Sequence, residues 1–193
     1  MKPPVLALLA LAACTPAASS PDPTAPSAAA IAATPAPTPA PAPLSAADPL
    51  VGQVAPDFTA TAQDGTSVHI AALTGKPIVV YFYPKDETPG CTKEACSFRD
   101  AWAPLAKTGA VLVGVSADSL DSHKAFVAHW KLPFLLVSDP DDSIGKKYGV
   151  PFESYHQRQT FVIGADGKVK KVYRKVDVKV HAQEILADLG AQP

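Results

Sequence analysis

The sequence predicts an α/β fold, in which a mostly parallel sheet is flanked by helices on both faces. Two segments, 77–83 (PIVVYFY) and 110–116 (AVLVGVS), are continuous runs of β-branched, aromatic and small apolar residues, as expected of strands buried on both faces. Residues with helical periodicity follow each run, and crossovers of this kind join parallel strands. We therefore expect residues 50–193 to form one domain of about 144 positions, a usual size for a single hydrophobic core.

The remaining elements follow from local patterns. Segments 58–61 and 67–70 flank Asp64-Gly65, a turn that favours a β-hairpin, which we expect as an N-terminal extension of the sheet. Helices are expected over 89–107, 119–130, 141–148 and 178–189, the last of them ending before Gly190. Further strands are expected over 134–137, 158–163 and 169–174, of which the last two would form an antiparallel edge.

The first 13 residues have the layout of a secretory signal peptide. Lys2 precedes an uncharged apolar stretch, 5–13, that is too short to span a bilayer. The run Leu11-Ala-Ala-Cys14 resembles the lipobox of bacterial lipoproteins, and this resemblance implies cleavage before Cys14 and lipidation of that cysteine. An ordinary cleaved signal with a chance cysteine is the alternative. The lipoprotein interpretation predicts a membrane-anchored protein in an oxidising, extracytoplasmic location, facing the periplasm in a Gram-negative cell.

Residues 14–49 are predicted to be a disordered tether that follows the lipidated cysteine. Beyond Cys14 the segment is nearly all Ala, Pro, Ser and Thr, so it buries too little apolar surface to offset its ordering entropy. Its Pro-Ala alternation favours extended geometry, at about 3.1 Å per residue. The formal net charge of the chain is −1, which gives no reason to expect a nucleic acid as partner.

Two of the three cysteines, Cys91 and Cys96, lie within one segment that carries a further motif. The pattern Pro84-x-x-x-Thr88-x-x-Cys91 resembles the active-site signature of peroxiredoxins, thioredoxin-fold enzymes that reduce peroxides. The continuation to Cys96 resembles the Q-type subfamily, also called bacterioferritin comigratory proteins, in which the second cysteine lies five residues after the first. The similarity continues through segments 114–119, 122–124, 132–134, 148–150 and 158–163.

This resemblance implies a thioredoxin-like fold and a set of roles. Cys91 would be the peroxidatic nucleophile and Cys96 the resolving thiol, while Thr88 and Arg158 would act in catalysis and, with Pro84 and Cys91, bind the peroxide. A thioredoxin-like donor would reduce the enzyme again, and no cofactor or metal is implied. The chain ends soon after its last helix, without the C-terminal arm that carries the resolving thiol in dimeric relatives, so we expect a monomer.

The residues themselves support this chemistry. A position in the first turn of a helix brings the Cys91 sulfur near unpaired N–H groups and the positive end of the helix dipole, which favours the thiolate. Thr88 suits the cap position and Pro89 the first helical position. Attack on a peroxide leaves Cys91 as a sulfenic acid, which further peroxide would oxidise irreversibly unless Cys96 condenses with it.

The spacing of Cys91 and Cys96 predicts a conformational change. Residues five apart in a regular helix have Cα atoms about 8.6 Å apart, whereas a disulfide tolerates at most about 7 Å. The first turns of the helix must therefore unwind for the two thiols to bond. A structural disulfide is a less favoured interpretation, because closing so short a loop would strain the helix. A zinc site is less favoured still, because no second pair of ligands accompanies the cysteines.

One alternative function belongs to a different class, namely a thioredoxin-fold lipoprotein that acts as a protein thiol–disulfide oxidoreductase. That activity favours a C-x-x-C motif, and it gives Thr88 and Arg158 no obvious use. Asp141-Asp142 is typical of a turn or a helix start. The histidines are scattered, and we expect none of them to ligate a metal and His156 to lie at the surface; they are His69, His123, His129, His156 and His181.

Overall fold

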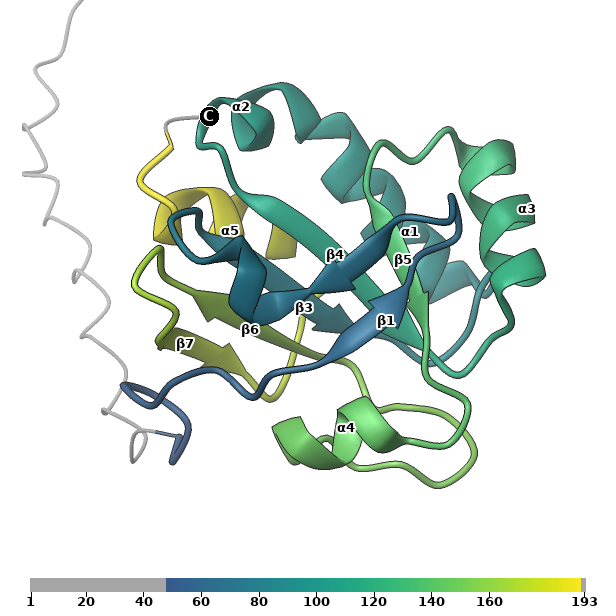
Figure 1. Ribbon diagram of the computed structural model, residues 1–193. Helices are drawn as coiled ribbons and strands as arrows, with labels where there is room; N and C mark the ends of the chain where they lie inside the picture. Colours follow the sequence, from purple (N-terminus) through teal and green to yellow (C-terminus); the bar gives the residue numbers. More distant parts are fainter. Residues whose placement is uncertain (1–47, 192–193) are drawn as a thin grey trace, which may run out of the picture. The chain divides into compact units, whose positions relative to one another are not determined.

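The computed structural model describes residues 48–191, and Figure 1 shows their elements in chain order. The strands are β1 Thr59–Thr61, β2 Ser67–His69, β3 Ile78–Phe82, β4 Val111–Ser116, β5 Leu135–Ser138, β6 Gln159–Ile163 and β7 Val169–Tyr173. The helices are η1 Ile70–Leu73, α1 Pro89–Asp100, α2 Trp102–Lys107, α3 Leu120–Trp130, α4 Ser143–Tyr148 and α5 His181–Asp188. The signal peptide 1–13, Cys14 and nearly all of the tether 14–49 lie outside the described residues. Within the described part of the chain, no helix combines the length and the hydropathy that a membrane span needs.

The central sheet has the strand order β5-β4-β3-β6-β7 and is mixed. Strands β3, β4 and β5 are parallel to one another, whereas β6 runs antiparallel to β3 and β7 antiparallel to β6. The α/β class is confirmed. We expected antiparallel pairing between β6 and β7, and β6 also pairs antiparallel with the central strand β3. Strand β6 is buried at all five positions, and such a pattern shows that a strand is central without showing its direction.

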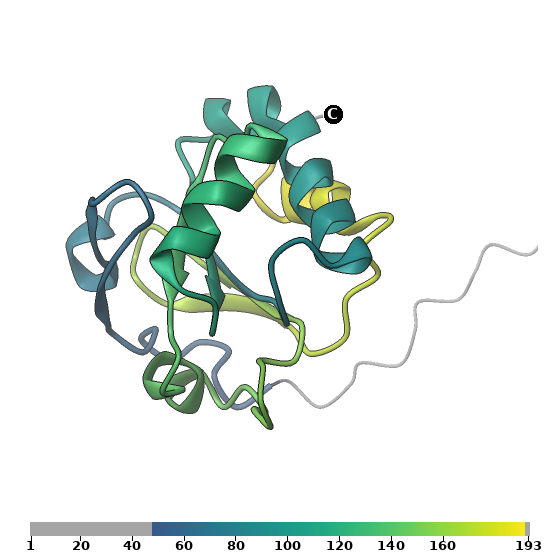
Figure 2. The same cartoon turned by 90° about the vertical axis from the view of Figure 1, so that its right-hand side faces the viewer.

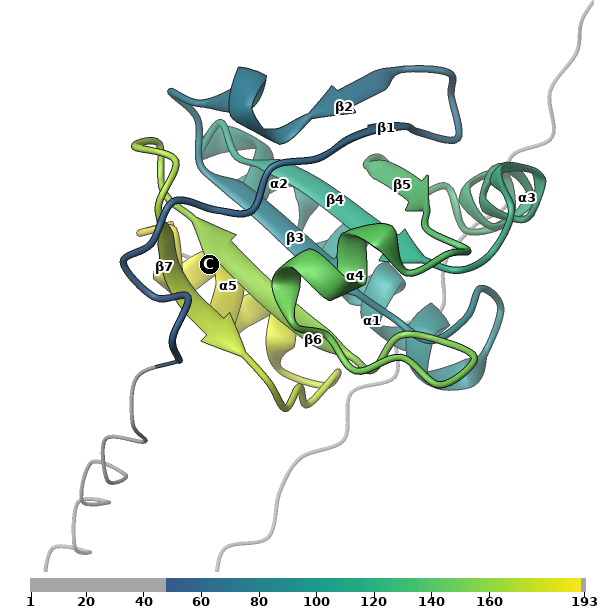
Figure 3. The same cartoon turned by 60° about the horizontal axis from the view of Figure 1, so that its bottom comes forward.

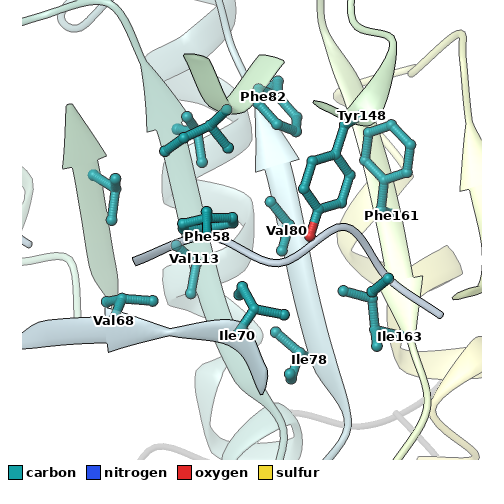
Figure 4. Close-up of a cluster of buried hydrophobic side chains, with 14 of the residues drawn as sticks. Phe58, Val68, Ile70, Ile78, Val80, Phe82, Val113, Tyr148, Phe161 and Ile163 are labelled. Atoms are coloured by element: carbon teal, nitrogen blue, oxygen red, sulfur yellow. The ribbon is translucent and has the colours of Figure 1, made fainter. Parts of the chain in front are cut away.

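The strand β3 lies between two hydrophobic layers, because successive side chains point to opposite faces of a sheet. Ile78, Val80 and Phe82 face a cluster that is closed by the β1–β2 hairpin and by α4 (Figures 3 and 4). Val79 and Tyr81 face a second cluster, to which α1, α2, α3 and α5 contribute. Figure 2 shows the sheet between the hairpin on one side and α1 and α5 on the other.

The helix expected over 89–107 is two helices, and this expectation is therefore wrong. The backbone of Ala101, with φ −88° and ψ 7°, ends α1 and begins α2. Pro104 is the physical reason, because a proline inside a continuous helix lacks the N–H for the bond to residue 100 and clashes with that carbonyl. The break shortens α1 and leaves both Cys91 and Cys96 in its 12 residues.

Asp48, two residues before the predicted boundary, contacts the domain. The Arg174 guanidinium, just beyond β7, donates from Nε to Asp48 Oδ2 at 2.6 Å and from Nη2 to Oδ1 at 3.3 Å. The same guanidinium donates to the carbonyl oxygens of Tyr148 and Gly149 at the end of α4. One arginine thus ties the start of the domain to its sheet and to α4.

Candidate active site

The loop between β3 and α1 is held in place by the buried carboxylate of Asp86. Its Oδ1 accepts a hydrogen bond from the Tyr83 hydroxyl at 2.7 Å, and its Oδ2 accepts one from Ser122 Oγ at 2.7 Å. His123 Nδ1 lies 2.8 Å from the same Oδ2. Burial raises the pKa of Asp86, but the contacts with His123 and Ser122 outweigh it and hold the pKa below its usual range. The backbone N–H of Asp86 in turn donates to Asp118 Oδ2 at 2.8 Å.

A second contact fixes the same loop from outside. Glu87 has a left-handed backbone, with φ 59°, which turns its exposed carboxylate toward the end of α3. There it accepts a hydrogen bond from Trp130 Nε1 at 2.9 Å and lies 3.0 Å from His129 Nδ1. Residues 86 and 87 therefore attach the loop to the first and last turns of α3, directly before α1 begins.

The N-terminus of α1 follows the expected arrangement in position but not in hydrogen bonding. Thr88 is the N-cap residue and Pro89 occupies the first helical position. The Thr88 hydroxyl makes no capping bond and donates instead to the carbonyl oxygen of Lys85 at 2.9 Å. The expectation that Thr88 caps the helix with its side chain is therefore wrong. The first turn keeps its unpaired N–H groups, and Cys91 lies within this turn, 2% exposed.

Arg158 meets the Cys91 sulfur from the other side of the site. Its Nη2 donates to Cys91 Sγ at 3.1 Å, and its Nη1 pairs with Glu94 Oε2. Arg158 directly precedes β6, so the sheet brings together two residues that are 67 positions apart in the chain. Burial works against the charged guanidinium, but the neighbouring Glu94 and Cys91 outweigh it and raise the pKa of Arg158.

Glu94 is a residue of this site that the sequence interpretation missed. Its carboxylate is buried, Oε1 has no hydrogen-bond partner, and Oε2 pairs with Arg158. Burial raises the pKa of Glu94 to about 7, against the opposing charge of Arg158. The available signal was its spacing: residues three apart lie on the same helical face, so a glutamate at this position shares the buried face of Cys91.

Cys96 lies in the same helix, and both cysteines are free thiols. It is half-buried, and burial raises the pKa of its thiol, with Arg99 acting in the opposite direction. Its side chain lines a pocket of about 480 Å³ that Lys93, Asp100 and Lys179 also line. Within an intact helix the two thiols are held apart, as the spacing requires. Pro84, the remaining residue expected here, is half-buried just beyond β3.

The expected surface position of His156 is wrong. Its side chain has no exposed area and packs against Phe82 and Phe152, with ring centroids 5.4 and 4.9 Å apart. His123 and His181 are fully buried as well. A histidine gives no periodic signal of its own, so burial could not be inferred from a segment without regular structure. Asp142 directly precedes α4, in agreement with the expected helix start.

Comparisons with known proteins agree with this geometry. The model of the AhpC/TSA family matches residues 51–172. A Coxiella burnetii protein named as a peroxiredoxin bcp is 42% identical over 147 residues, which cover 72% of this chain and 97% of the relative. The chloroplastic peroxiredoxin Q of Sedum lineare is 49% identical over 125 residues, covering 63% of this chain and 67% of the relative.

Solved structures show the same similarity. Peroxidoxin BcpB from Mycobacterium tuberculosis matches with a TM-score of 0.68 at 34% identity, covering 72% of this chain and 96% of that chain. Peroxiredoxin Q from Xanthomonas campestris matches with a TM-score of 0.67 at 35% identity, covering 72% and 94%. The expected thioredoxin-like fold is thereby confirmed.

This chain belongs to the AhpC/TSA family, whose members at this level of similarity are peroxiredoxins. The resemblance to the Q-type, or bacterioferritin comigratory, subfamily is confirmed as well. The protein is a thiol-dependent peroxidase, and peroxiredoxins act on peroxides with thioredoxin-like reductants. The alternative of a protein thiol–disulfide oxidoreductase is correspondingly less favoured.

The raised pKa of Glu94 predicts a specific dependence of stability on pH. A carboxyl group whose pKa rises from 4.5 to about 7 on folding binds its proton more tightly in the folded state. Its contribution to stability is therefore complete below the lower value and is lost as the pH rises through about 7. We expect the free energy of unfolding of the wild type, relative to Glu94→Gln, to fall across this window by at most about 3 kcal/mol.

Urea denaturation of the wild type and of Glu94→Gln at a series of pH values measures this difference in the free energy of unfolding. Groups that titrate alike in both proteins do not contribute to the difference. Glu153→Gln, at an exposed position, is the charge-matched control. A difference that stays flat or increases with pH would show that the Glu94 carboxyl does not hold its proton in the folded protein.

Proposed function

We propose that Cys91 is the nucleophile of this peroxidase and that Arg158 holds it as a thiolate. The observation that carries this proposal is the 3.1 Å hydrogen bond from Arg158 Nη2 to Cys91 Sγ at the N-terminus of α1. A charged donor and the unpaired N–H groups of a first helical turn both favour the ionised sulfur. Near-complete burial excludes water, which strengthens both interactions.

The first step is attack of the Cys91 thiolate on one peroxide oxygen. A sulfur–oxygen bond forms as the oxygen–oxygen bond breaks, and the departing alkoxide or hydroxide takes up a proton to give alcohol or water. Arg158 is positioned to stabilise charge on the departing oxygen. The Thr88 hydroxyl donates its hydrogen to the carbonyl oxygen of Lys85. Toward the peroxide this hydroxyl can therefore only accept a hydrogen bond, which orients the O–H of the substrate. Pro84, half-buried just beyond β3, would contact the bound peroxide.

The second step is condensation of the Cys91 sulfenic acid with the Cys96 thiol, which forms a disulfide and releases water. Both cysteines lie in α1, so the first turns of this helix unwind to let the sulfurs meet. A thioredoxin-like dithiol then reduces the disulfide and becomes oxidised itself, and the helix re-forms. No cofactor or metal takes part in this cycle.

We further propose that the enzyme is a monomer that is anchored to a membrane by lipid on Cys14. The support is the similarity of Leu11-Ala-Ala-Cys14 to a lipobox after an apolar stretch, and the Pro/Ala-rich composition of the tether that follows. An enzyme placed in this way would remove peroxides at an extracytoplasmic membrane surface. Its reductant would be a thioredoxin-like protein of the same compartment.

Cysteine replacements test the assigned roles. We expect Cys91→Ser to reduce peroxide consumption by at least about a thousandfold, because serine supplies no comparable nucleophile at neutral pH. Cys96→Ser should keep a rapid single turnover, accumulate sulfenic acid that dimedone traps, and lose steady-state turnover with a thioredoxin-like dithiol. Stopped-flow assays and mass spectrometry measure both effects.

Cys14→Ser is the control for replacing a cysteine outside the site, and its turnover in solution should equal that of the wild type. Steady turnover by Cys91→Ser would refute the assignment of the nucleophile. Full steady-state turnover by Cys96→Ser would refute the resolving role alone and leave the nucleophile in place.

Hydrogen exchange tests the proposed unwinding. Amides of residues 91–96 are expected to exchange at least about tenfold faster in the disulfide form than in the dithiol form, because their helical hydrogen bonds open. Amides of α5 in the same samples provide the internal control. Equal protection of 91–96 in a sample whose disulfide is verified by mass would contradict the proposal.

Expression of the full chain in a Gram-negative host tests the lipid anchor. We expect the wild type to incorporate labelled fatty acid and to fractionate with membranes, because several acyl chains anchor a protein durably. Cys14→Ser should lose both the label and the membrane association. A wild-type protein that is cleaved elsewhere, with a free thiol at Cys14, would show an ordinary signal peptide.

A further inference from the structure

Three buried side chains converge on the face of the sheet that α4 covers, away from the two cysteines. They are Asp139, directly after β5, Asp142, directly before α4, and His156, in the segment that leads to β6. His156 Nε2 lies 3.1 Å from Asp139 Oδ2 and 3.3 Å from Asp142 Oδ1. None of the three side chains is more than 9% exposed, and that of His156 has no exposed area.

Both contacts have the length of an ion pair, but neither has the N–H direction that a hydrogen bond requires. Both nitrogens of His156 and Asp142 Oδ1 are buried without a hydrogen-bond partner, so the ring N–H does not point along either contact. An unpaired buried polar atom is costly, and native structures seldom keep several of them together without a reason. The potential ligand atoms of the three side chains instead lie within 4.8 Å of one another.

The two distances from His156 Nε2 match the separation of ligands around one small cation. Zinc and similar ions hold imidazole nitrogen and carboxylate oxygen at about 2.0 to 2.2 Å. Two such ligands lie about 3.3 Å apart in tetrahedral geometry and about 2.9 Å apart in octahedral geometry. The observed 3.1 and 3.3 Å fall in this interval. Calcium and magnesium prefer ligand sets made of oxygen alone, so the imidazole disfavours them.

The surrounding backbone orients these ligands. The Asp139 carboxylate accepts hydrogen bonds from the backbone N–H groups of Ile144, at 3.0 Å, and Gly145, at 2.9 Å. Such outer contacts fix the direction of a metal-binding carboxylate. Asp142 has a left-handed backbone, with φ 58°, directly before α4, a conformation that aspartate adopts more readily than most residues.

Glycine is required at position 145 because of the same cluster. A Cβ atom there would collide with Asp142 Oδ1 and would lie 2.7 Å from His156 Nε2. Any other residue would therefore fill the space between the backbone of α4 and the converging oxygen and nitrogen atoms.

We propose that Asp139, Asp142 and His156 form a binding site for one divalent first-row transition cation, with zinc as its representative. The ion would cross-link the segment after β5 to the segment before β6. His156 lies two residues before Arg158, so the bound ion would fix the backbone from which Arg158 reaches Cys91. Only this link to Arg158 rests on the proposed function; cation binding does not.

Cobalt(II) titration of the purified, reduced full chain tests the site, because cobalt substitutes for zinc and its absorption identifies the ligands. We expect one cobalt per chain with d–d bands but without the thiolate charge-transfer band that binding to cysteine produces. Zinc should displace the cobalt and raise the melting temperature, since a ligand that binds only the folded state stabilises it.

Asp142→Asn is the most informative variant, because Oδ1 has no partner in the protein and the amide has the same shape. We expect it to weaken binding by at least about tenfold to a hundredfold, and His156→Gln to do the same. His69→Gln is the matched control. It removes a histidine that lies 3.0 Å from a single exposed aspartate, Asp57, and it should bind cobalt like the wild type.

Two results would overturn the proposal. One is cobalt uptake that is unchanged in both Asp142→Asn and His156→Gln. The other is the absence of cobalt uptake by the wild type; nitrogen NMR shifts that show His156 protonated on both nitrogens would then identify the cluster as a buried imidazolium–carboxylate ion pair. Neither result would bear on peroxide turnover by Cys91, so this test is separate from that of the proposed function.

Discussion

The buried contact of Arg158 with Cys91 and Glu94 determines how the candidate active site is built. Three ionisable groups share a site that is nearly closed to solvent, and charges there are tolerable only when they are paired. The sheet topology makes this pairing possible. Strand β6 runs antiparallel to β3, with Phe82 opposite Gln159, so the end of β3 lies beside the start of β6. A parallel β6 would place Arg158 at the opposite edge, far from α1.

The contacts around α1 fix the loop before this helix but leave its first turn without a side-chain cap. Asp86 and Glu87 attach the preceding loop to α3 through buried and exposed hydrogen bonds. The first turn of α1, by contrast, has no side-chain cap, because the Thr88 hydroxyl bonds to Lys85 O. A missing cap leaves a helix end less stable by about 1 kcal/mol. In the proposed cycle this helix end opens. The hydrogen bond from Thr88 to Lys85 O therefore orients the substrate and also leaves the helix end easier to unwind.

The sequence predicted the elements of this fold better than their arrangement. Buried strands such as 77–83 follow from local apolar runs, and the motif around Cys91 was sufficient to place the candidate site at the start of α1. The direction of β6 was not predictable, because a strand buried on both faces reads the same in either direction. Pro104 was a readable signal for the break between α1 and α2 that the periodicity obscured. Glu94 was missed although its spacing from Cys91 places both on one face of α1, whereas the burial of His156 comes from tertiary packing, which local patterns do not encode.

One edge of the sheet collects the polar groups of an otherwise apolar interior. The parallel strands β3, β4 and β5 end there, and each is followed within four residues by an aspartate: Asp86, Asp118 and Asp139. Ligands of α/β proteins commonly bind outside the carboxyl ends of such strands. The antiparallel β6 starts at the same edge, which adds His156 and Arg158. The thiol site and the proposed cation site therefore share the segment 156–158. An interaction that fixes His156 also restricts the positions that the Arg158 guanidinium can reach.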